Sequence, residues 1–118
     1  MGYTHYIRNK RAFTDAEWDQ FTKEVKEMLD KTDIPVANGC GDEDSHPIIS
    51  DKGVYFNGVG DDAHETAFMP KGSASFDFCK TARKPYDKLV VNMYKIAERI
   101  LGSGITLTSD GGSGVFED

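Results

Sequence analysis

The sequence predicts an α+β fold in which two helices pack on a mostly antiparallel sheet, in the order β-α-β-β-β-α-β. Three observations support this prediction: an alternating segment near the N-terminus, two amphipathic helix patterns, and short β-rich runs separated by turn residues. The chain has 118 residues, of which 38% are hydrophobic. This length suits one core, so a single compact domain over residues 1–118 is expected.

The first strand and the first helix have clear local signals. Residues 3–8, "YTHYIR", alternate between two faces and predict a strand. Thr14 and Glu17 then have the spacing of a capping box at a helix start. Phe13 and Trp18 have the spacing of a hydrophobic staple, and the apolar pattern predicts a helix to about Lys31.

The middle third predicts short strands within an acidic region. Residues 33–65 contain eight acidic residues against the single Lys52. The runs 47–50 and 53–58 flank the turn "DKG" and predict a hairpin, and residues 65–69 predict a third strand ended by Pro70.

The second helix and the last strand complete the pattern. Pro85 is expected at the first helical position, and an apolar stripe runs from Tyr86 to Leu101 before Gly102. Residues 105–109, "ITLTS", predict the last strand, which can pair with the first in the centre of the sheet.

A cationic stretch before the second helix is the main functional signal. Residues 80–88 carry Lys80, Arg83, Lys84 and Lys88, although the chain has a net charge of −6. Cations are unfavourable beside a helix N-terminus, whereas an anion is attracted there. We therefore predict an anion pocket with Arg83 as the main contact and Lys80 as the second. The alternative is a solvated loop whose cations balance nearby carboxylates.

Further ligand contacts are predicted around this pocket. The backbone N–H groups near Tyr86 and Asp87 would complete the cradle, and the Asp87 carboxylate would orient Arg83 or a ligand hydroxyl. Tyr6 is the preferred stacking residue, and Arg8 lies on the same strand face. The last two predicted contacts, Asn57 and Asp110, stand beside glycines and could accept bonds from a ribose or simply make turns.

Other chemistries are disfavoured by the sequence. The acidic groups around His46 and His64 lack metal-site spacing, so we predict no metal and no cofactor. Cys79 lies between phenylalanines and is expected to be buried and inert. The negative charge disfavours general nucleic-acid binding, and no apolar run reaches the ~20 residues of a membrane span. A cytoplasmic location is expected.

Four motifs resemble a known family. "MGYTHY", "FNG", "FCKTARKPYD" and "SDG" occur together in a family of small uncharacterised proteins found in phages and bacteria. The resemblance covers residues 1–111, with Ile7 standing where relatives have the tryptophan of "GYTHYW". It implies candidate positions and a phage-like setting, without a mechanism.

These observations favour a binding protein over an enzyme. The leading hypothesis is capture of an anionic, nucleotide-derived ligand, which in a phage would sequester a host immune signal. One alternative is a small hydrolase or phosphodiesterase with His5 or His64 as general base. Another is an acidic module that binds a protein partner. A shallow pocket in so small a chain leads us to expect a homo-oligomer.

Overall fold

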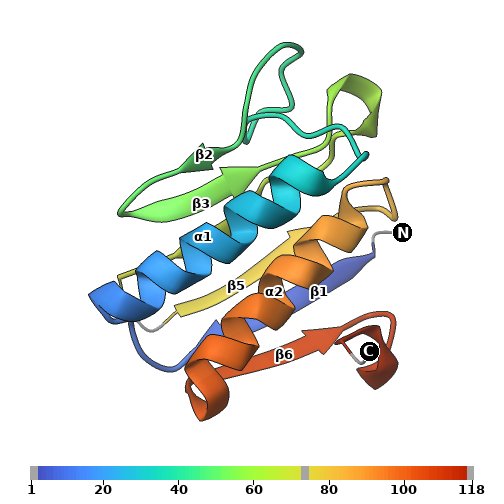
Figure 1. Cartoon of the computed structure of the whole chain (residues 1–118). Coiled ribbons are helices and arrows are strands. Elements are labelled where there is room, and N and C mark those ends of the chain that lie inside the picture. Colours follow the sequence, from blue (N-terminus) through green and yellow to red (C-terminus); the bar gives the residue numbers. More distant parts are fainter. Residues whose placement is uncertain (1–2, 73–74, 117–118) are drawn as a thin grey trace.

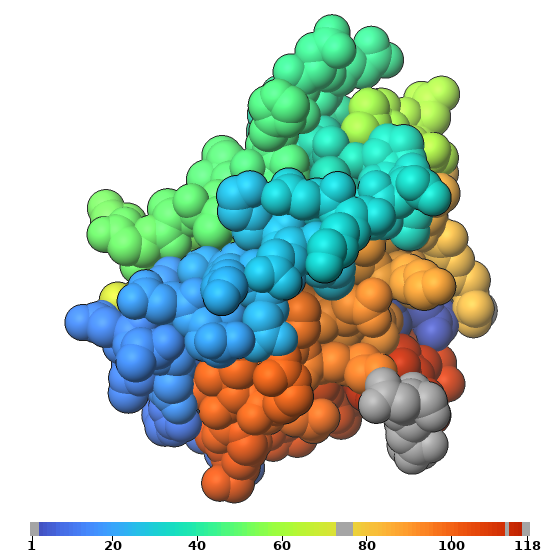
Figure 2. Space-filling model, in the orientation of Figure 1, coloured from blue at the N-terminus to red at the C-terminus, as the bar shows by residue number. Residues whose placement is uncertain are grey.

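The computed structural model describes residues 3–72 and 75–116 and has the α+β architecture expected from the sequence. Its strands are β1 (Thr4–Asn9), β2 (Ile48–Ile49), β3 (Gly53–Phe56), β4 (Ala67–Pro70), β5 (Ser75–Lys80) and β6 (Ile105–Ser109). Its helices are α1 (Asp15–Lys31) and α2 (Asp87–Leu101), which lie side by side across one face of the strands (Figure 1). The same two helices occupy the face seen in Figure 2, where the segment around residues 40–50 projects beyond them.

The strands form two antiparallel sheets of three, in the orders β5-β1-β6 and β2-β3-β4. The predicted pairing of the first and last strands is confirmed, because His5 pairs with Ser109 and Asn9 with Ile105. One strand was missed: β5 makes the order β-α-β-β-β-β-α-β, and its residue Lys80 pairs with Thr4 on the other side of β1.

Local signals place α1 as expected. The Thr14 hydroxyl accepts the Glu17 N–H, and the Glu17 carboxylate accepts the Thr14 N–H, so the capping box is present. The rings of Phe13 and Trp18 lie 5.0 Å apart, edge to face, which confirms the staple. Bonds from Arg11 and Thr14 hold the pKa of Glu17 down to about 2. The helix start therefore follows from residues within a few positions of one another.

The start of α2 differs from the expectation. The helix begins at Asp87 with Tyr86 as its N-cap residue, so Pro85 lies in the preceding turn and not at the first helical position. Gly102 ends the helix with a φ of 57°, a left-handed conformation that glycine adopts without a steric penalty. The buried apolar side chains of the helices and both sheets form one cluster.

Candidate functional site

A buried histidine lies where β1, β6 and the start of α2 meet. The His5 side chain is fully buried. Its Nε2 donates to Asp87 Oδ1 at 2.6 Å, and its Nδ1 faces the Ser109 hydroxyl at 2.8 Å. Thr81, also 0% exposed, donates its hydroxyl to the same Asp87 oxygen. We call His5, Thr81, Asp87 and Ser109 the histidine network.

The ionised form of Asp87 is favoured by its partners. Burial alone raises the pKa of this carboxyl group, but hydrogen bonds from His5 and Thr81, with the charges of His5 and Arg83, hold the pKa below its usual value. The Asp87 side chain is 22% exposed, so the network reaches the surface at this residue. Asp87 therefore joins the buried histidine to the cationic surface around Arg83.

The turn between β5 and α2 presents Arg83. The Lys84 N–H donates to the Thr81 carbonyl at 3.0 Å, which closes a turn over residues 81–84. Its two central residues, Ala82 and Arg83, have φ values of 51° and 57°. A left-handed conformation costs about 1–2 kcal/mol for a residue with a Cβ. A strained backbone conformation persists only where the surrounding structure holds it in place. Such conformations are concentrated at functional sites. We call residues 81–84 the Arg83 turn.

Tyr3 supports the Arg83 side chain. The guanidinium carbon lies 4.0 Å from the centre of the Tyr3 ring, a cation–π contact that leaves the exposed guanidinium edge open to a partner. The Tyr3 ring also packs edge to face on His5, with ring centres 5.0 Å apart. The Tyr3 carbonyl accepts the Thr81 N–H at 2.9 Å. The arginine is thus oriented by the same residues that enclose the histidine.

Several predicted contacts gather near this turn, but with different roles. The Asp110 carboxylate accepts bonds from the Thr4 N–H and the Tyr6 hydroxyl. The Asp87 N–H donates to the Lys84 carbonyl at 2.9 Å, so it does not serve the predicted cradle. Tyr86 is fully buried and donates its hydroxyl to the Glu65 carbonyl at 2.6 Å, which makes it a core residue.

Of the other predicted contacts, Arg8 and Asn57 lie apart from the histidine network, and Lys80 directly precedes its Thr81. Arg8 pairs with residue 76, four positions along β1 from the Thr4–Lys80 pair, so Arg8 does not lie beside the cationic stretch of residues 80–88. The Lys80 ammonium lies 5.9 Å from the Phe78 ring centre. Asn57 lies beside the other sheet with 2% exposure, and its amide makes four hydrogen bonds to the backbone of residues 39, 58 and 64.

Three residues of the site, Thr81, Ser109 and Tyr3, were not predicted from the sequence. Ser109 and His5 share a cross-strand pair, a relation that only the register of β1 and β6 reveals. Thr81 had a weak signal, because a threonine between a strand and a helix start often bonds to nearby polar groups. No sequence signal indicated the positive φ values of Ala82 and Arg83, since left-handed turn positions usually carry glycine or asparagine.

The reactive groups considered from the sequence are constrained. Burial raises the pKa of Cys79 to about 12, so its thiol is protonated at neutral pH. Both ring nitrogens of His5 are engaged, and its ring has no solvent contact.

No three metal-ligating side chains come together within residues 3–72 and 75–116. In the same part of the chain, no helix has the length and apolar character that crossing a bilayer requires.

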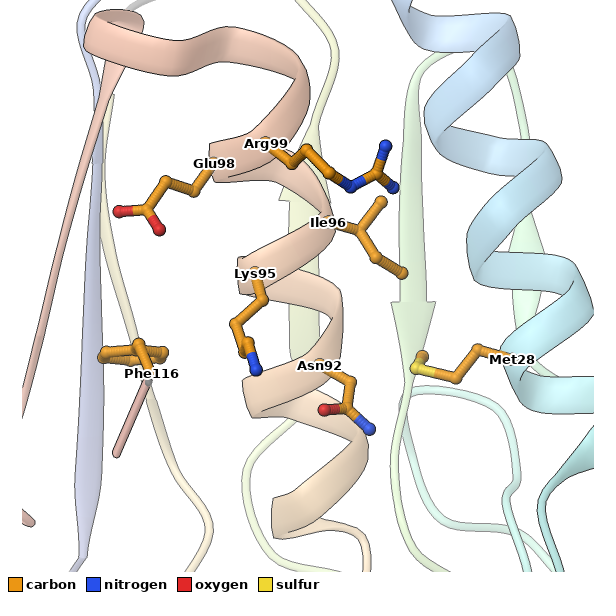
Figure 3. A pocket seen from close by; sticks show the side chains of 7 residues that line it. All are labelled: Met28, Asn92, Lys95, Ile96, Glu98, Arg99 and Phe116. Carbon is orange, nitrogen blue, oxygen red and sulfur yellow. The ribbon is translucent and has the colours of Figure 1, made fainter. Parts of the chain in front are cut away.

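Two surface hollows lie away from the Arg83 turn. One of about 470 Å³ lies between α1, α2 and the C-terminal turn, with Met28, Lys95, Arg99 and Phe116 in its wall (Figure 3). Another of about 510 Å³ is lined by residues of α1 and the segment around His46. Neither is lined by a predicted contact residue, so the Arg83 turn is a surface site and not part of either hollow.

Comparison with known proteins adds no relative. No protein-family model matches the chain, and no curated protein or solved structure is significantly similar to it.

Proposed function

We propose that the protein binds an anionic, nucleotide-derived small molecule at the Arg83 turn. The observation that carries the proposal is the strained turn that holds the Arg83 guanidinium on the Tyr3 ring. A planar guanidinium in a fixed orientation suits a phosphate or carboxylate, which it grips through two parallel hydrogen bonds. The histidine network keeps the turn in place through Thr81 and Asp87.

The ligand is held rather than altered. His5, the general base of the alternative hydrolase, is fully buried with both nitrogens engaged. The series Ser109–His5–Asp87 favours that alternative, since a hydroxyl, an imidazole and a carboxylate in sequence can activate a nucleophile. Chromatography after incubation with nucleotides distinguishes the two, because a binding protein returns its ligand intact. In a phage-like setting, binding without turnover would sequester a host immune nucleotide signal, by analogy with such proteins.

Arg83→Ala is expected to weaken nucleotide binding tenfold or more, because one charge-assisted contact is worth roughly 1.5–3 kcal/mol. Calorimetric titration against mono-, di- and cyclic nucleotides measures the effect. The melting temperature should hardly change, since Arg83 is exposed and its substitution leaves the network intact. Lys84→Ala is the matched control and should bind like the parent protein. Equal affinity of Arg83→Ala and the parent would refute the proposed site.

Arg83→Gly separates binding from folding. Glycine adopts the φ of 57° without steric cost, so this variant should be at least as stable as Arg83→Ala in urea unfolding. It should still lose the ligand, because the guanidinium is gone. Retained binding by Arg83→Gly would mean that the turn backbone, and not the side chain, holds the anion.

The proposal includes a symmetric homo-oligomer, with a dimer favoured. The Arg83 turn lies on the surface outside both hollows, and a second copy would supply the missing wall of a ligand site. Sedimentation over micromolar concentrations is expected to show a dimer. A monomer that still binds nucleotides would remove the second copy from the proposal and leave the Arg83 contact.

A further inference from the structure

The outward side of the sheet β5-β1-β6 exposes an aromatic pair. Phe78 is 49% exposed, and Tyr6 lies opposite it across the β1–β5 pair with ring centres 6.4 Å apart. Within the described chain, the only other large hydrophobic side chain so exposed is Ile48, at 51%, in β2. Neighbouring His5 and Cys79 point to the core, so Tyr6 and Phe78 occupy the side of the sheet away from the helices. We call this surface the outer face.

The outer face is cationic although the chain is acidic. The Lys80 ammonium lies 5.9 Å from the Phe78 ring centre, and exposed Arg8 follows Tyr6 on the same side of β1. On β6, Thr106 pairs with Arg8 and Thr108 pairs with Tyr6, and both threonines are exposed. No carboxylate stands at positions 6, 8, 78, 80, 106 or 108, in a chain with 20 acidic residues against 14 basic ones. Two carboxylates border the face: Asp110 accepts the Tyr6 hydroxyl, and Glu65 accepts the Lys80 backbone N–H at 2.8 Å.

The geometry points to the outer face as a binding surface for a short single-stranded nucleic acid. Bases stack on exposed aromatic rings without regard to sequence, and two adjacent rings accept two successive bases. Successive residues on one side of a strand are about 7 Å apart, so Lys80 and Arg8 flank the ring pair where the phosphates pass. The threonine hydroxyls of β6 supply hydrogen bonds to bases or sugars.

This surface adjoins the Arg83 turn, because Lys80 directly precedes Thr81, but its aromatic pair lies on the side of the sheet opposite His5 and has its own occupant. It spans only a few nucleotides and carries two cations, so it differs from the long basic groove of a general nucleic-acid binder. A small aromatic pair between cations suits unpaired bases, which present their faces, and not a duplex, whose bases are stacked within the helix.

Fluorescence anisotropy with labelled 12-nucleotide oligomers of deoxythymidine and of uridine tests the inference at low salt. Phe78→Ser is expected to weaken binding about tenfold or more through the lost stacking. Ile48→Ser, which replaces an equally exposed apolar residue on the other sheet, should bind like the parent. Log affinity should fall linearly with log salt, and Lys80→Gln should reduce the slope by about 0.7, the loss of one phosphate contact.

Any one of four results would overturn the inference. The first is that the parent protein binds neither oligomer. If the parent is then a dimer and Phe78→Ser is a monomer, the outer face is a contact between copies of the chain. The second is that Phe78→Ser binds the oligomers with the same affinity as the parent. The third is that a mononucleotide displaces the labelled oligomer at the same concentration as an unlabelled 12-mer does, because the surface would then bind a single nucleotide. If Phe78→Ser does not fold by its melting curve, an unchanged salt slope in Lys80→Gln would equally refute the inference.

Discussion

Asp87→Ala is expected to lower the free energy of unfolding by about 3 kcal/mol, because it leaves a buried histidine and a buried threonine without their shared acceptor. His5 Nε2 lies 2.6 Å from the carboxylate, and both His5 and Thr81 are 0% exposed. The Asp87 side chain is 22% exposed, so water can enter only through the space that the alanine leaves, and it would have to serve two fully buried side chains there. Urea unfolding followed by circular dichroism measures the change in midpoint at constant slope.

The control for Asp87 is an exposed carboxylate in an ion pair. Asp30→Ala removes the i,i+4 partner of Lys26 on α1, where both side chains are more than half exposed, and should change stability by no more than about 0.5 kcal/mol. The loss in free energy of unfolding for Asp87→Asn should lie between those for Asp87→Ala and Asp30→Ala, since the asparagine oxygen still accepts a hydrogen bond from His5 but carries no charge. A loss below 1 kcal/mol for Asp87→Ala would show that the network does not hold the turn.

The Asp87 contribution should depend on pH in the acidic range. The pKa of this group is lower in the folded protein than its ordinary value of 3.8. The ionised form is therefore favoured by folding, so its stabilisation is full above about pH 4 and is lost as the pH falls through the folded pKa. The stability difference between the parent and Asp87→Asn should accordingly shrink from pH 7 to pH 3. A constant difference across this range would contradict the assigned role of the charge.

Asn57→Ala is expected to lower the free energy of unfolding by about 2–4 kcal/mol. The Asn57 amide nitrogen donates to the carbonyls of Gly39 and His64, and its oxygen accepts the N–H groups of Gly58 and His64. One side chain thus joins the loop around Gly39 to the loop between β3 and β4, and neither loop has much regular structure of its own. Alanine removes the side-chain partner of the Gly58 N–H and of the His64 N–H and carbonyl, whereas the Gly39 carbonyl still accepts the Thr66 hydroxyl at 2.6 Å. Each buried group left unsatisfied costs about 1–3 kcal/mol unless water reaches it.

The same experiment decides between two roles for Asn57. A ligand contact would predict normal stability and reduced nucleotide affinity, the reverse of the loop-joining role. Asn92→Ala, at a partly exposed position on α2, is the control and should lie within about 0.5 kcal/mol of the parent. Asn57→Asp should also destabilise, because a carboxylate would face the two carbonyls that now receive hydrogen bonds.

The parts of the structure predictable from sequence are those set by neighbouring residues. The start of α1 depends on Thr14, Glu17, Phe13 and Trp18, which lie within six positions. β5 was missed because Phe78 faces solvent while Cys79 faces the core, so the strand lacks the usual polar-outward alternation.

The candidate site was predictable only in part. Arg83 and Asp87 were identified from their position at the helix start, and the structure places both at one surface. The histidine network joins residues 5, 81, 87 and 109. The predicted pairing of the first and last strands did not give the register that sets Ser109 opposite His5, and β5 on the other edge of β1 was not predicted. Arg8 was grouped with Arg83 because strand direction and register cannot be read from charge.

The central place of β1 has a consequence for how the chain acquires its shape. β1 comes first in synthesis, yet its two neighbours are residues 75–80 and 105–109. Loops of about 70 and 100 residues must close before either edge of β1 is paired, and such closures slow folding relative to locally connected helical proteins. During synthesis β1 therefore stays unpaired until residues 75–80 have left the ribosome, and its second edge stays open until residues 105–109 follow. Early pausing or truncation would leave that strand free to pair with other chains.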